Sequence, residues 1–430
     1  MVARQHQDSI RRRRLTALAV GTALACTALP ALSACSGGGG GDAAAGSVSI
    51  SPEQGGQVDA SSPVVVSATG GGHLSDVTVY DADGARVPGE LASDDKSWRT
   101  TEPLGAGRKY TVQVLSDGGG SGFSSSVRTF TTKSASNLLT AQLGPADGAV
   151  YGVGEPITAT LSAPVHDPEA RKEVESGLVV KSNPSVTGGW YWVDDRTLHF
   201  RPQGYWPAHA AISASFDLHG RRIGPPSSKL YAGSPTKIAF RTGDSMVSVT
   251  DVASDYMKIY RNGNVIRTLP VTTGKAGFRT RGGIKVVLEQ APEVFMNSET
   301  VGIAAGSSNA YHMNVYWDTR VTWSGEYVHA APWSEGSQGV ANVSHGCTGM
   351  STENARWFYE NFRKGDVVQV VHADGKQMEP FGNGFGDWNL SWSQWRSGSA
   401  LGRPVVTATD VDGGSGASAQ QVGYLRPQAS

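Results

Sequence analysis

Residues 325–350 read GEYVHAAPWSEGSQGVANVSHGCTGM, and this stretch decides which fold and chemistry the sequence predicts. It contains one cysteine, Cys347, and two histidines, His329 and His345. A thiol is only a few per cent ionised at neutral pH, so a catalytic cysteine needs a nearby base or a positive field. Either histidine could be that base, and their spacing does not say which. Gly346 allows a tight turn in which successive N–H groups can face a developing oxyanion.

The same residues permit two other interpretations. His329, His345 and Cys347 could bind zinc with His312 as a fourth ligand, although no CxxC or HExxH spacing supports a metal site. Cys347 could also be a small buried residue packed among core histidines. The residues alone leave all three interpretations open.

Residues 1–34 have the pattern of a bacterial export signal. Arginines at 11–14 precede an apolar stretch at 15–31 that is short and interrupted by Pro30, so it is a poor membrane span. The segment ends in LSAC, which resembles a lipobox and predicts cleavage before a lipidated Cys35. An ordinary secretory signal is the alternative, and the arginines also permit twin-arginine export.

Processing at this site leaves a single free thiol. Cys26 is removed with the signal and Cys35 carries the lipid, so Cys347 is the remaining cysteine of the three. An unpaired thiol in an exported protein needs a reason, such as burial or reactivity. Residues 35–46 are rich in Gly and Ala and predict a flexible tether. The predicted location is therefore the outer face of the cell membrane.

The 430-residue chain is long enough for several domains, and its formal net charge is −1. Without a basic field it is not expected to bind nucleic acid. Residues 47–133 and 137–243 both show short β-rich runs punctuated by Gly and Pro, which predicts two immunoglobulin-like β-sandwiches. Trp98 is a predicted core residue. Trp190, Trp192 and Trp206 fit core packing better than sugar binding.

Residues 245–372 predict a further β-rich domain with one main helix. Asn262-Gly263 predicts the turn of a hairpin, and Ser351 is a suitable N-cap for a helix with Gly365 as its stop. Residues 373–430 contain three tryptophans and no long regular element. This extension is expected to pack on the domain at 245–372, with a loose tail. The predicted fold class is mainly β.

The spacing from His329 to Ser-His-Gly-Cys resembles the signature of the YkuD-type L,D-transpeptidases. LPVTTGK at 269–275, NARWFY at 354–359 and GDWN at 386–389 also resemble segments of that family. The order of signal, two immunoglobulin-like domains and catalytic domain is similar to the actinobacterial lipoprotein members. The resemblance covers nearly the whole mature chain and is closest from about residue 248 to 400.

The resemblance implies roles for individual residues. Cys347 would form a thioester with a donor stem, and His329 would be the base, oriented by the backbone carbonyl of Ala330. The N–H groups of Gly346 and Cys347, with the Tyr311 hydroxyl, would form the oxyanion hole. The remaining residues would shape or line the pocket and donor channel: His345, Ser344, Trp333, Ser324, Gly325 and Met296.

One position departs from the family pattern. Gly349 stands where the family commonly has Asn, two residues after the cysteine. A side-chain amide contact is thereby missing, and donor or acceptor preference could differ. The thiol, the base and the backbone donors all remain, so the activity is still expected.

The function implied by the resemblance is 3→3 cross-linking of peptidoglycan stems. A tetrapeptide donor would lose its terminal D-alanine, carbapenems would act as inhibitors, and no cofactor or metal would be needed. One alternative is a cysteine carboxypeptidase that uses water as acceptor. NlpC/P60 peptidases place the Cys before the His, opposite to the order here. A non-catalytic wall-binding lipoprotein is the other alternative.

Overall fold

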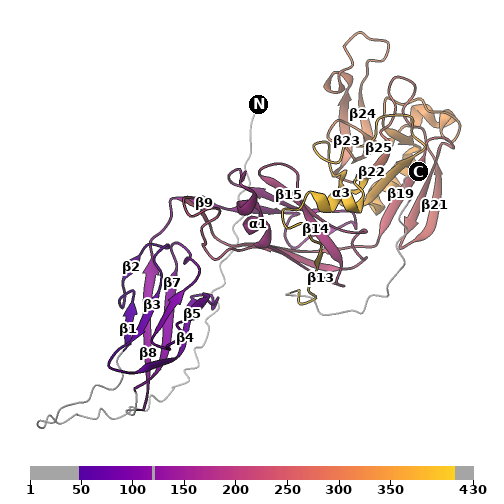
Figure 1. The fold of residues 1–430 in the computed structure, drawn as a ribbon. Coiled ribbons are helices and arrows are strands. Elements are labelled where there is room, and N and C mark those ends of the chain that lie inside the picture. Colours follow the sequence, from indigo (N-terminus) through magenta and orange to yellow (C-terminus); the bar gives the residue numbers. More distant parts are fainter. Residues whose placement is uncertain (1–47, 119–121, 412–430) are drawn as a thin grey trace, which may run out of the picture. The chain divides into compact units, whose positions relative to one another are not determined.

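The computed structural model describes residues 48–118 and 122–411, in which strands are the predominant regular structure (Figure 1). The predicted export signal, Cys35 with its lipid, the tether and the tail after residue 411 lie outside the described residues. Within those residues, no helix is long and apolar enough to cross a lipid bilayer. The predicted fold class is confirmed: two sandwiches precede a β-rich domain with one main helix and an extension.

The first domain is a sandwich of two four-stranded sheets. Its strands are β1 (Val48–Ser51), β2 (Gln57–Val58), β3 (Val65–Ala68), β4 (His73–Asp81), β5 (Gly89–Leu91), β6 (Ser97–Thr100), β7 (Lys109–Asp117) and β8 (Phe123–Thr132). The strand orders are β1-β3-β6-β5 and β2-β8-β7-β4. Alternate residues of β7, including Tyr110, Val112 and Val114, are buried because successive side chains of a strand face opposite sides. Trp98 lies in the same core, as predicted.

The second domain contains a five-stranded and a four-stranded sheet, with a small third pair. Its strands, one of them from the end of the chain, are β9 (Asn137–Leu139), β10 (Ala141–Gly144), β11 (Val150–Tyr151), β12 (Ile157–Leu161), β13 (Leu178–Asn183), β14 (Thr187–Trp192), β15 (Thr197–Pro202), β16 (Ala211–Phe216), β17 (Leu230–Ala232), β18 (Thr236–Thr242) and β28 (Val405–Val406). The orders are β10-β12-β15-β14-β28, β11-β18-β16-β13 and β17-β9. Trp190, Trp192 and Trp206 are all buried in its core, which agrees with packing and not with an exposed sugar platform.

Helix α1 (Pro168–Ser176) in this domain is absent from the sequence-based expectation. Asp167 caps it by accepting a hydrogen bond from the Ala170 N–H, and Pro168 occupies the first turn, where no N–H is needed. These start signals are present in the sequence. The helix is short and strongly charged, with few apolar positions, so its amphipathic pattern is weak.

The catalytic domain is built from two sheets. Its strands are β19 (Met246–Asp251), β20 (Tyr256–Arg261), β21 (Asn264–Pro270), β22 (Gly283–Val286), β23 (Glu289–Asn297), β24 (His312–Arg320), β25 (Tyr327–Ala330), β26 (Thr348–Met350) and β27 (Val367–Val371), with 3-10 turns η1 (Ser298–Val301) and η2 (Pro332–Ser337). The orders are β21-β20-β19-β27-β22 and β23-β24-β25-β26. The predicted hairpin is confirmed, since Asn262 and Gly263 turn between β20 and β21 with positive φ of 49° and 84°.

Helix α2 (Thr352–Asn361) follows β26 and packs on β24 and β25. Ser351 is its N-cap, as predicted, and its side chain accepts from the Asn354 N–H. The helix ends at Asn361, earlier than a stop at Gly365 implies. Gly365, with φ of 86°, instead turns the chain into β27.

The C-terminal extension contains η3 (Asp387–Asn389), helix α3 (Trp392–Ser397) and β28. It contacts the catalytic domain where the Asn389 side chain both accepts from and donates to the backbone of Ile284. It also packs on the second domain, because β28 pairs with β14 and the Trp395 indole donates to the Gly189 carbonyl at 2.8 Å. The expectation of packing on the catalytic domain alone was therefore incomplete, since aromatic residues do not specify which surface they cover.

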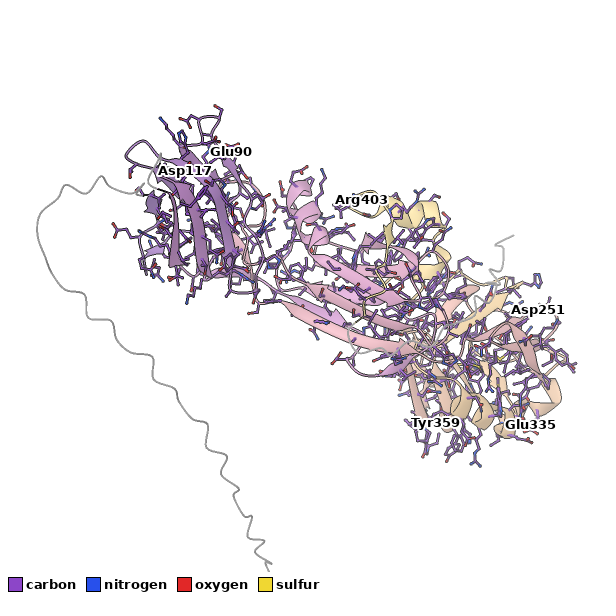
Figure 2. All side chains as sticks on the ribbon, turned by 90° about the horizontal axis from the view of Figure 1, so that it is seen from below. Glu90, Asp117, Asp251, Glu335, Tyr359 and Arg403 are labelled. Atoms are coloured by element: carbon purple, nitrogen blue, oxygen red, sulfur yellow. The ribbon has the colours of Figure 1, made fainter. Side chains whose placement is uncertain are left out.

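Arg201 lies at the centre of this junction and is fully buried. Its guanidinium carbon lies 4.9, 5.6 and 4.5 Å from the ring centroids of Trp388, Trp392 and Trp395. It also donates to the Leu390 carbonyl at 2.8 Å. A desolvated cation over aromatic faces is attracted by their quadrupoles. The extension is thus fixed to the second domain by a buried charge as well as by apolar packing. Figure 2 draws the side chains on the ribbon of each domain.

Candidate active site

Cys347 lies immediately before β26, and His329 lies on the neighbouring strand β25. The two strands are parallel, with His329 paired to Gly349 and Val328 paired to Thr348. Cys347 is partly exposed and is the free cysteine of the described residues, whereas His329 is only 5% exposed. Strand pairing therefore brings together two residues that stand eighteen positions apart in the sequence.

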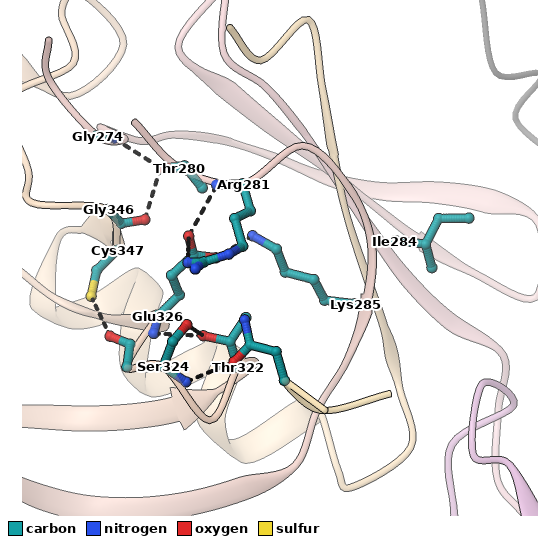
Figure 3. A network of polar contacts seen from close by, with 12 residues as sticks. Gly274, Thr280, Arg281, Ile284, Lys285, Thr322, Ser324, Glu326, Gly346 and Cys347 are labelled. Carbon is teal, nitrogen blue, oxygen red and sulfur yellow. Dashed lines mark hydrogen bonds and ion pairs between the residues drawn. The ribbon is translucent and has the colours of Figure 1, made fainter. Parts of the chain in front are cut away.

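The Cys347 thiol is neutral in the resting site. Its Sγ donates to the Gly325 carbonyl at 3.6 Å (Figure 3). Burial raises the pKa of the thiol to about 12, the negative charges of Glu326 and Asp318 add to this, and the Tyr327 N–H and Lys285 act in the opposite direction. The raised pKa disfavours a preformed thiolate, so nucleophilic attack by this sulfur would require a base to take its proton.

The His329 imidazole is suited to accept that proton. Its Nδ1 lies 2.8 Å from the Ala330 carbonyl oxygen, which can only accept, so Nδ1 carries the hydrogen and Nε2 keeps a lone pair. Burial lowers the pKa of His329, which keeps the ring neutral near pH 7. Trp333 stacks against the ring at 6.1 Å between centroids. Among the described residues, neither His329 nor His345 is hydrogen-bonded to the thiol.

The turn before Cys347 is shaped by Ser344. The Ser344 hydroxyl accepts from the Gly346 N–H at 3.1 Å and donates to the Cys347 carbonyl at 2.6 Å. Gly346 has φ of 123°, a conformation that other residues rarely adopt. Its carbonyl accepts from the Thr280 hydroxyl at 2.8 Å. These contacts hold the turn in place. The Gly346 N–H, which the family resemblance assigns to an oxyanion hole, donates to the Ser344 hydroxyl in this structure.

His345 forms one wall of the site. Its ring lies edge-on to Phe278 at 4.8 Å and 5.2 Å from the ring of Tyr311. Its Nε2 is 3.4 Å from the Asn309 side-chain oxygen, which also accepts from Lys275 at 2.8 Å. Burial, helped by the Lys275 charge, lowers the pKa of His345. These contacts connect the cysteine turn to the segment that joins β23 and β24.

The structure also places the other residues named from sequence. Tyr311 is half-buried, and burial raises the pKa of its phenol, with a smaller contribution from Cys347 in the same direction. The Ser324 hydroxyl is 3.2 Å from that of Thr322. Trp333 is 55% exposed, and Met296 on β23 is paired with Met313 on β24.

The alternative zinc site is not formed by the described residues. In the described part of the chain, the possible metal ligands that lie close enough together are Asp81, Asp83 and His219, which are far from the cysteine in sequence. His312 instead lies 3.7 Å from Glu299. The Nδ1 of His329 is already occupied by a carbonyl oxygen.

The sequence matches known proteins over both of its parts. The family described as "L,D-transpeptidase catalytic domain" matches residues 245–370, and the family described as "Bacterial Ig domain" matches residues 55–222. L,D-transpeptidase 2 of Mycobacterium tuberculosis is 35% identical over 343 residues, which cover 80% of this chain and 82% of that protein. The chain belongs to the L,D-transpeptidase family.

Further relatives of the transpeptidase cover a smaller part of it. L,D-transpeptidase 1 of Mycobacterium tuberculosis is 36% identical over 231 residues, 54% of this chain and 84% of that protein. The solved structure of the L,D-transpeptidase LdtMt1 in complex with imipenem is 35% identical and covers 55% of this chain and 99% of that one, with a TM-score of 0.46. The transpeptidase is thus an acyltransferase, as the sequence predicts.

Three buried ionisable residues near the thiol were missed by sequence reasoning. Lys285, Asp318 and Glu326 are 1%, 1% and 6% exposed. All three affect the pKa of Cys347. Each is a charged residue in a β-rich region, and the local sequence does not indicate that its side chain is buried. Only the folded arrangement of the sheets places them beside the cysteine.

Gly349 is explained by the space around it. A Cβ added there would lie 2.9 Å from the Ala331 Cβ and 3.2 Å from the Thr272 Cγ2, both close to the backbone. Gly349 also exchanges two backbone hydrogen bonds with Thr272. We expect Gly349→Asn to destabilise the transpeptidase by about 1–3 kcal/mol through overpacking. Denaturant titration measures this.

The double variant Ala331→Gly/Gly349→Asn is the matched control. Removing the Ala331 methyl relieves the closest contact, so the double variant should recover part of the lost stability. A Gly349→Asn protein as stable as the wild type would contradict the steric explanation.

Asp318 predicts a pH-dependent stability. Both of its carboxylate oxygens are buried without a hydrogen-bond partner in the described part of the chain, and burial raises the pKa to about 7 from an ordinary 3.8. The folded state therefore holds this proton more tightly than the unfolded state does. The protonated carboxyl causes no loss of folding free energy below about pH 4, and stability is lost progressively as pH rises through about 7. Asp318→Asn should stabilise by about 2–3 kcal/mol more at about pH 8.5 than at about pH 5, since one pKa unit is about 1.4 kcal/mol.

Thermal unfolding of both proteins at the two pH values checks this prediction. Asp251→Asn is a suitable control, because Asp251 is paired with His372 on the surface and its pKa is lowered. An Asp318→Asn effect that is equal at both pH values would rule out a titrating carboxyl as its cause.

Proposed function

We propose that the transpeptidase forms 3→3 cross-links between peptidoglycan stem peptides through a thioester on Cys347. The observation that carries this proposal is the pairing of β25 with β26, which sets a neutral, oriented His329 beside the cysteine turn. The match to L,D-transpeptidase 2 over most of both chains supports the same activity.

The raised pKa of the thiol and the lowered pKa of the imidazole favour a concerted first step. His329 Nε2 takes the thiol proton as Sγ attacks the carbonyl that precedes the terminal D-alanine of a tetrapeptide donor. The Cys347 N–H and the Tyr311 hydroxyl stabilise the oxyanion, and the Gly346 N–H joins them when it exchanges its bond to the Ser344 hydroxyl for one to the oxyanion. The imidazolium returns the proton to the departing D-alanine amine, which leaves a thioester.

The second half of the reaction uses the same groups in reverse. His329 accepts a proton from the side-chain amine of an acceptor stem as that amine attacks the thioester carbonyl. Collapse of the tetrahedral intermediate frees Cys347 and leaves an amide between two diaminopimelate residues. Water in place of the amine would give the carboxypeptidase alternative.

Carbapenems are proposed inhibitors, because a strained β-lactam carbonyl offers Cys347 an acyl group without requiring a leaving D-alanine. The chain is also proposed to act at the outer face of the membrane, held by a lipid on Cys35 and spaced from it by the two sandwich domains. The lipobox-like LSAC sequence supports this anchor. Membrane fractionation of a Cys35→Ala variant tests it, since a variant that stays as firmly bound as the wild type would contradict it.

The activity is tested by incubating the purified protein with a disaccharide-tetrapeptide and measuring product masses. Transpeptidation is supported by a dimer whose mass equals that of two substrate molecules minus one molecule of free D-alanine. Formation of tripeptide alone would transfer the assignment to a carboxypeptidase. Protein alkylated at Cys347 is the control, and equal product from it, or none from unmodified protein, would overturn the proposal.

A further inference from the structure

A buried ion pair lies directly behind the cysteine site (Figure 3). The Lys285 ammonium is 2.5 Å from the Glu326 carboxylate, and the two side chains are 1% and 7% exposed. Taking two charges out of water is costly, and replacing such a pair by apolar residues is often neutral for stability. Stability alone therefore does not account for this pair.

Glu326 is held by more than Lys285. Its other carboxylate oxygen accepts from the Arg281 N–H at 2.9 Å and lies 3.3 Å from the Arg281 guanidinium. Its own N–H donates to the Thr322 hydroxyl at 2.9 Å. The side chain and the backbone of this one residue are therefore both anchored, and Lys285 is the more deeply buried of its two cationic partners.

The backbone groups of the residues on either side of Glu326 interact with the Cys347 sulfur. The Gly325 carbonyl accepts from the Cys347 thiol at 3.6 Å, and the Tyr327 N–H interacts with the sulfur and favours its ionised form. Gly325 has φ of 98°, so it turns the chain sharply into Glu326. The backbone of 325–327 thus offers one acceptor for the thiol and one donor for the thiolate, and Glu326 between them carries the anchored carboxylate.

We propose that Lys285 and Glu326 are positioning residues for Cys347, whose ion pair holds the 324–327 turn with its carbonyl and amide against the sulfur. This inference rests on the proposed role of Cys347 as nucleophile. Neither residue touches the reacting carbonyl. They act through the main chain of Gly325 and Tyr327, which keeps the sulfur oriented before attack and lowers the cost of its ionisation.

The test uses four variants: Lys285→Met, Glu326→Ala, Glu326→Gln and the double variant Lys285→Met/Glu326→Leu. Glu326→Gln keeps the side-chain length and one of the two acceptor oxygens, so it can still accept from Lys285 but loses the second acceptor, which faces the Arg281 N–H. It is the conservative variant. The double variant leaves neither charge unpaired, which guards against a simple failure to fold. Glu289→Gln is the matched control, because it breaks a half-exposed pair with Arg320, 3.2 Å apart, in the same domain.

The first measurement is acylation kinetics per folded molecule, with thermal unfolding recorded alongside. Lys285→Met, Glu326→Ala and the double variant should lower kcat about 10–100-fold and change KM less than about 3-fold, as expected when preorganisation is lost. Glu326→Gln should recover to within about 5-fold of wild type. A double variant with wild-type kcat, or a Glu326→Gln variant as impaired as Glu326→Ala, would overturn the proposal.

The second measurement is iodoacetamide alkylation of Cys347 at about pH 9, which needs no peptide substrate. Because the rate follows the thiolate fraction, Lys285→Met should lower it at least about 3-fold, while Glu289→Gln leaves it unchanged. Alkylation that is equal in Lys285→Met and wild type would overturn the positioning role. If wild type fails the cross-linking assay but the alkylation rates differ as expected, the failure lies with the proposed function and not with this inference.

Discussion

Replacing Cys347 by serine is expected to lower the acylation rate at least about 10⁴-fold while leaving the fold intact. Serine differs by one atom, so the Ser344 contacts to the turn and the strand pairing of β26 persist. A hydroxyl is far harder to ionise than a thiol, and the site already raises the pKa of the thiol to about 12. Removing a nucleophile typically costs several orders of magnitude in kcat.

Mass spectrometry of the protein after exposure to a carbapenem measures this loss directly, because the acylated enzyme gains the mass of the inhibitor. Thermal unfolding of Cys347→Ser supplies the control for folding. Adduct formation at a rate within about ten-fold of wild type would show that the acyl group is carried elsewhere. The same raised pKa predicts slow alkylation of the resting thiol at neutral pH and a rate that rises about ten-fold per pH unit without levelling off up to about pH 11.

Replacing Trp395 by alanine is expected to give the largest loss of stability, about 3–5 kcal/mol. Trp395 is completely buried, its indole donates to the Gly189 carbonyl, and its ring packs on Arg201 and Tyr191. The alanine variant loses this packing, leaves the Gly189 carbonyl without its partner and removes one aromatic face from a buried guanidinium.

Chemical denaturation monitored by circular dichroism measures the change. Trp333→Ala is the matched control, because that tryptophan is 55% exposed and its loss should change the free energy of unfolding by less than about 1 kcal/mol. The second domain and the catalytic domain are expected to unfold together in the wild type. A Trp395→Ala protein as stable as Trp333→Ala would mean that the extension contributes little to this junction.

Much of the fold could be predicted because local rules agree with the tertiary structure. The hairpin follows from Asn262-Gly263, the start of α2 from Ser351, and the β-sandwiches from short strands with alternating apolar residues. Helix α1 was not predicted, because it has too few apolar positions to show a helical pattern. The packing of the extension on the second domain was not predicted, because tryptophans at 388, 392 and 395 indicate burial but not the surface against which they are buried.

The candidate site was predictable only in part, and for a different reason. The reactive pair came from a resemblance to a family, since spacing alone left His329 and His345 equivalent. The structure separates them physically: Ala330 orients the first, and aromatic rings enclose the second. Lys285, Asp318 and Glu326 could not be found, because whether a residue of a strand or of the turn beside it faces water or the interior depends on sheets that form over long sequence separations.

The pairing of β28 with β14 has a consequence for how the protein is made. Residues 405–406 complete a sheet whose other strands lie between 141 and 202, so they leave the ribosome some two hundred residues after the edge they cover. Until then the edge of β14 is open, and open edges are templates for pairing with other chains. A nascent chain that stalls or is cleaved before residue 405 would therefore expose an edge that chaperones and proteases can recognise. Incomplete chains would then be degraded more readily than complete ones.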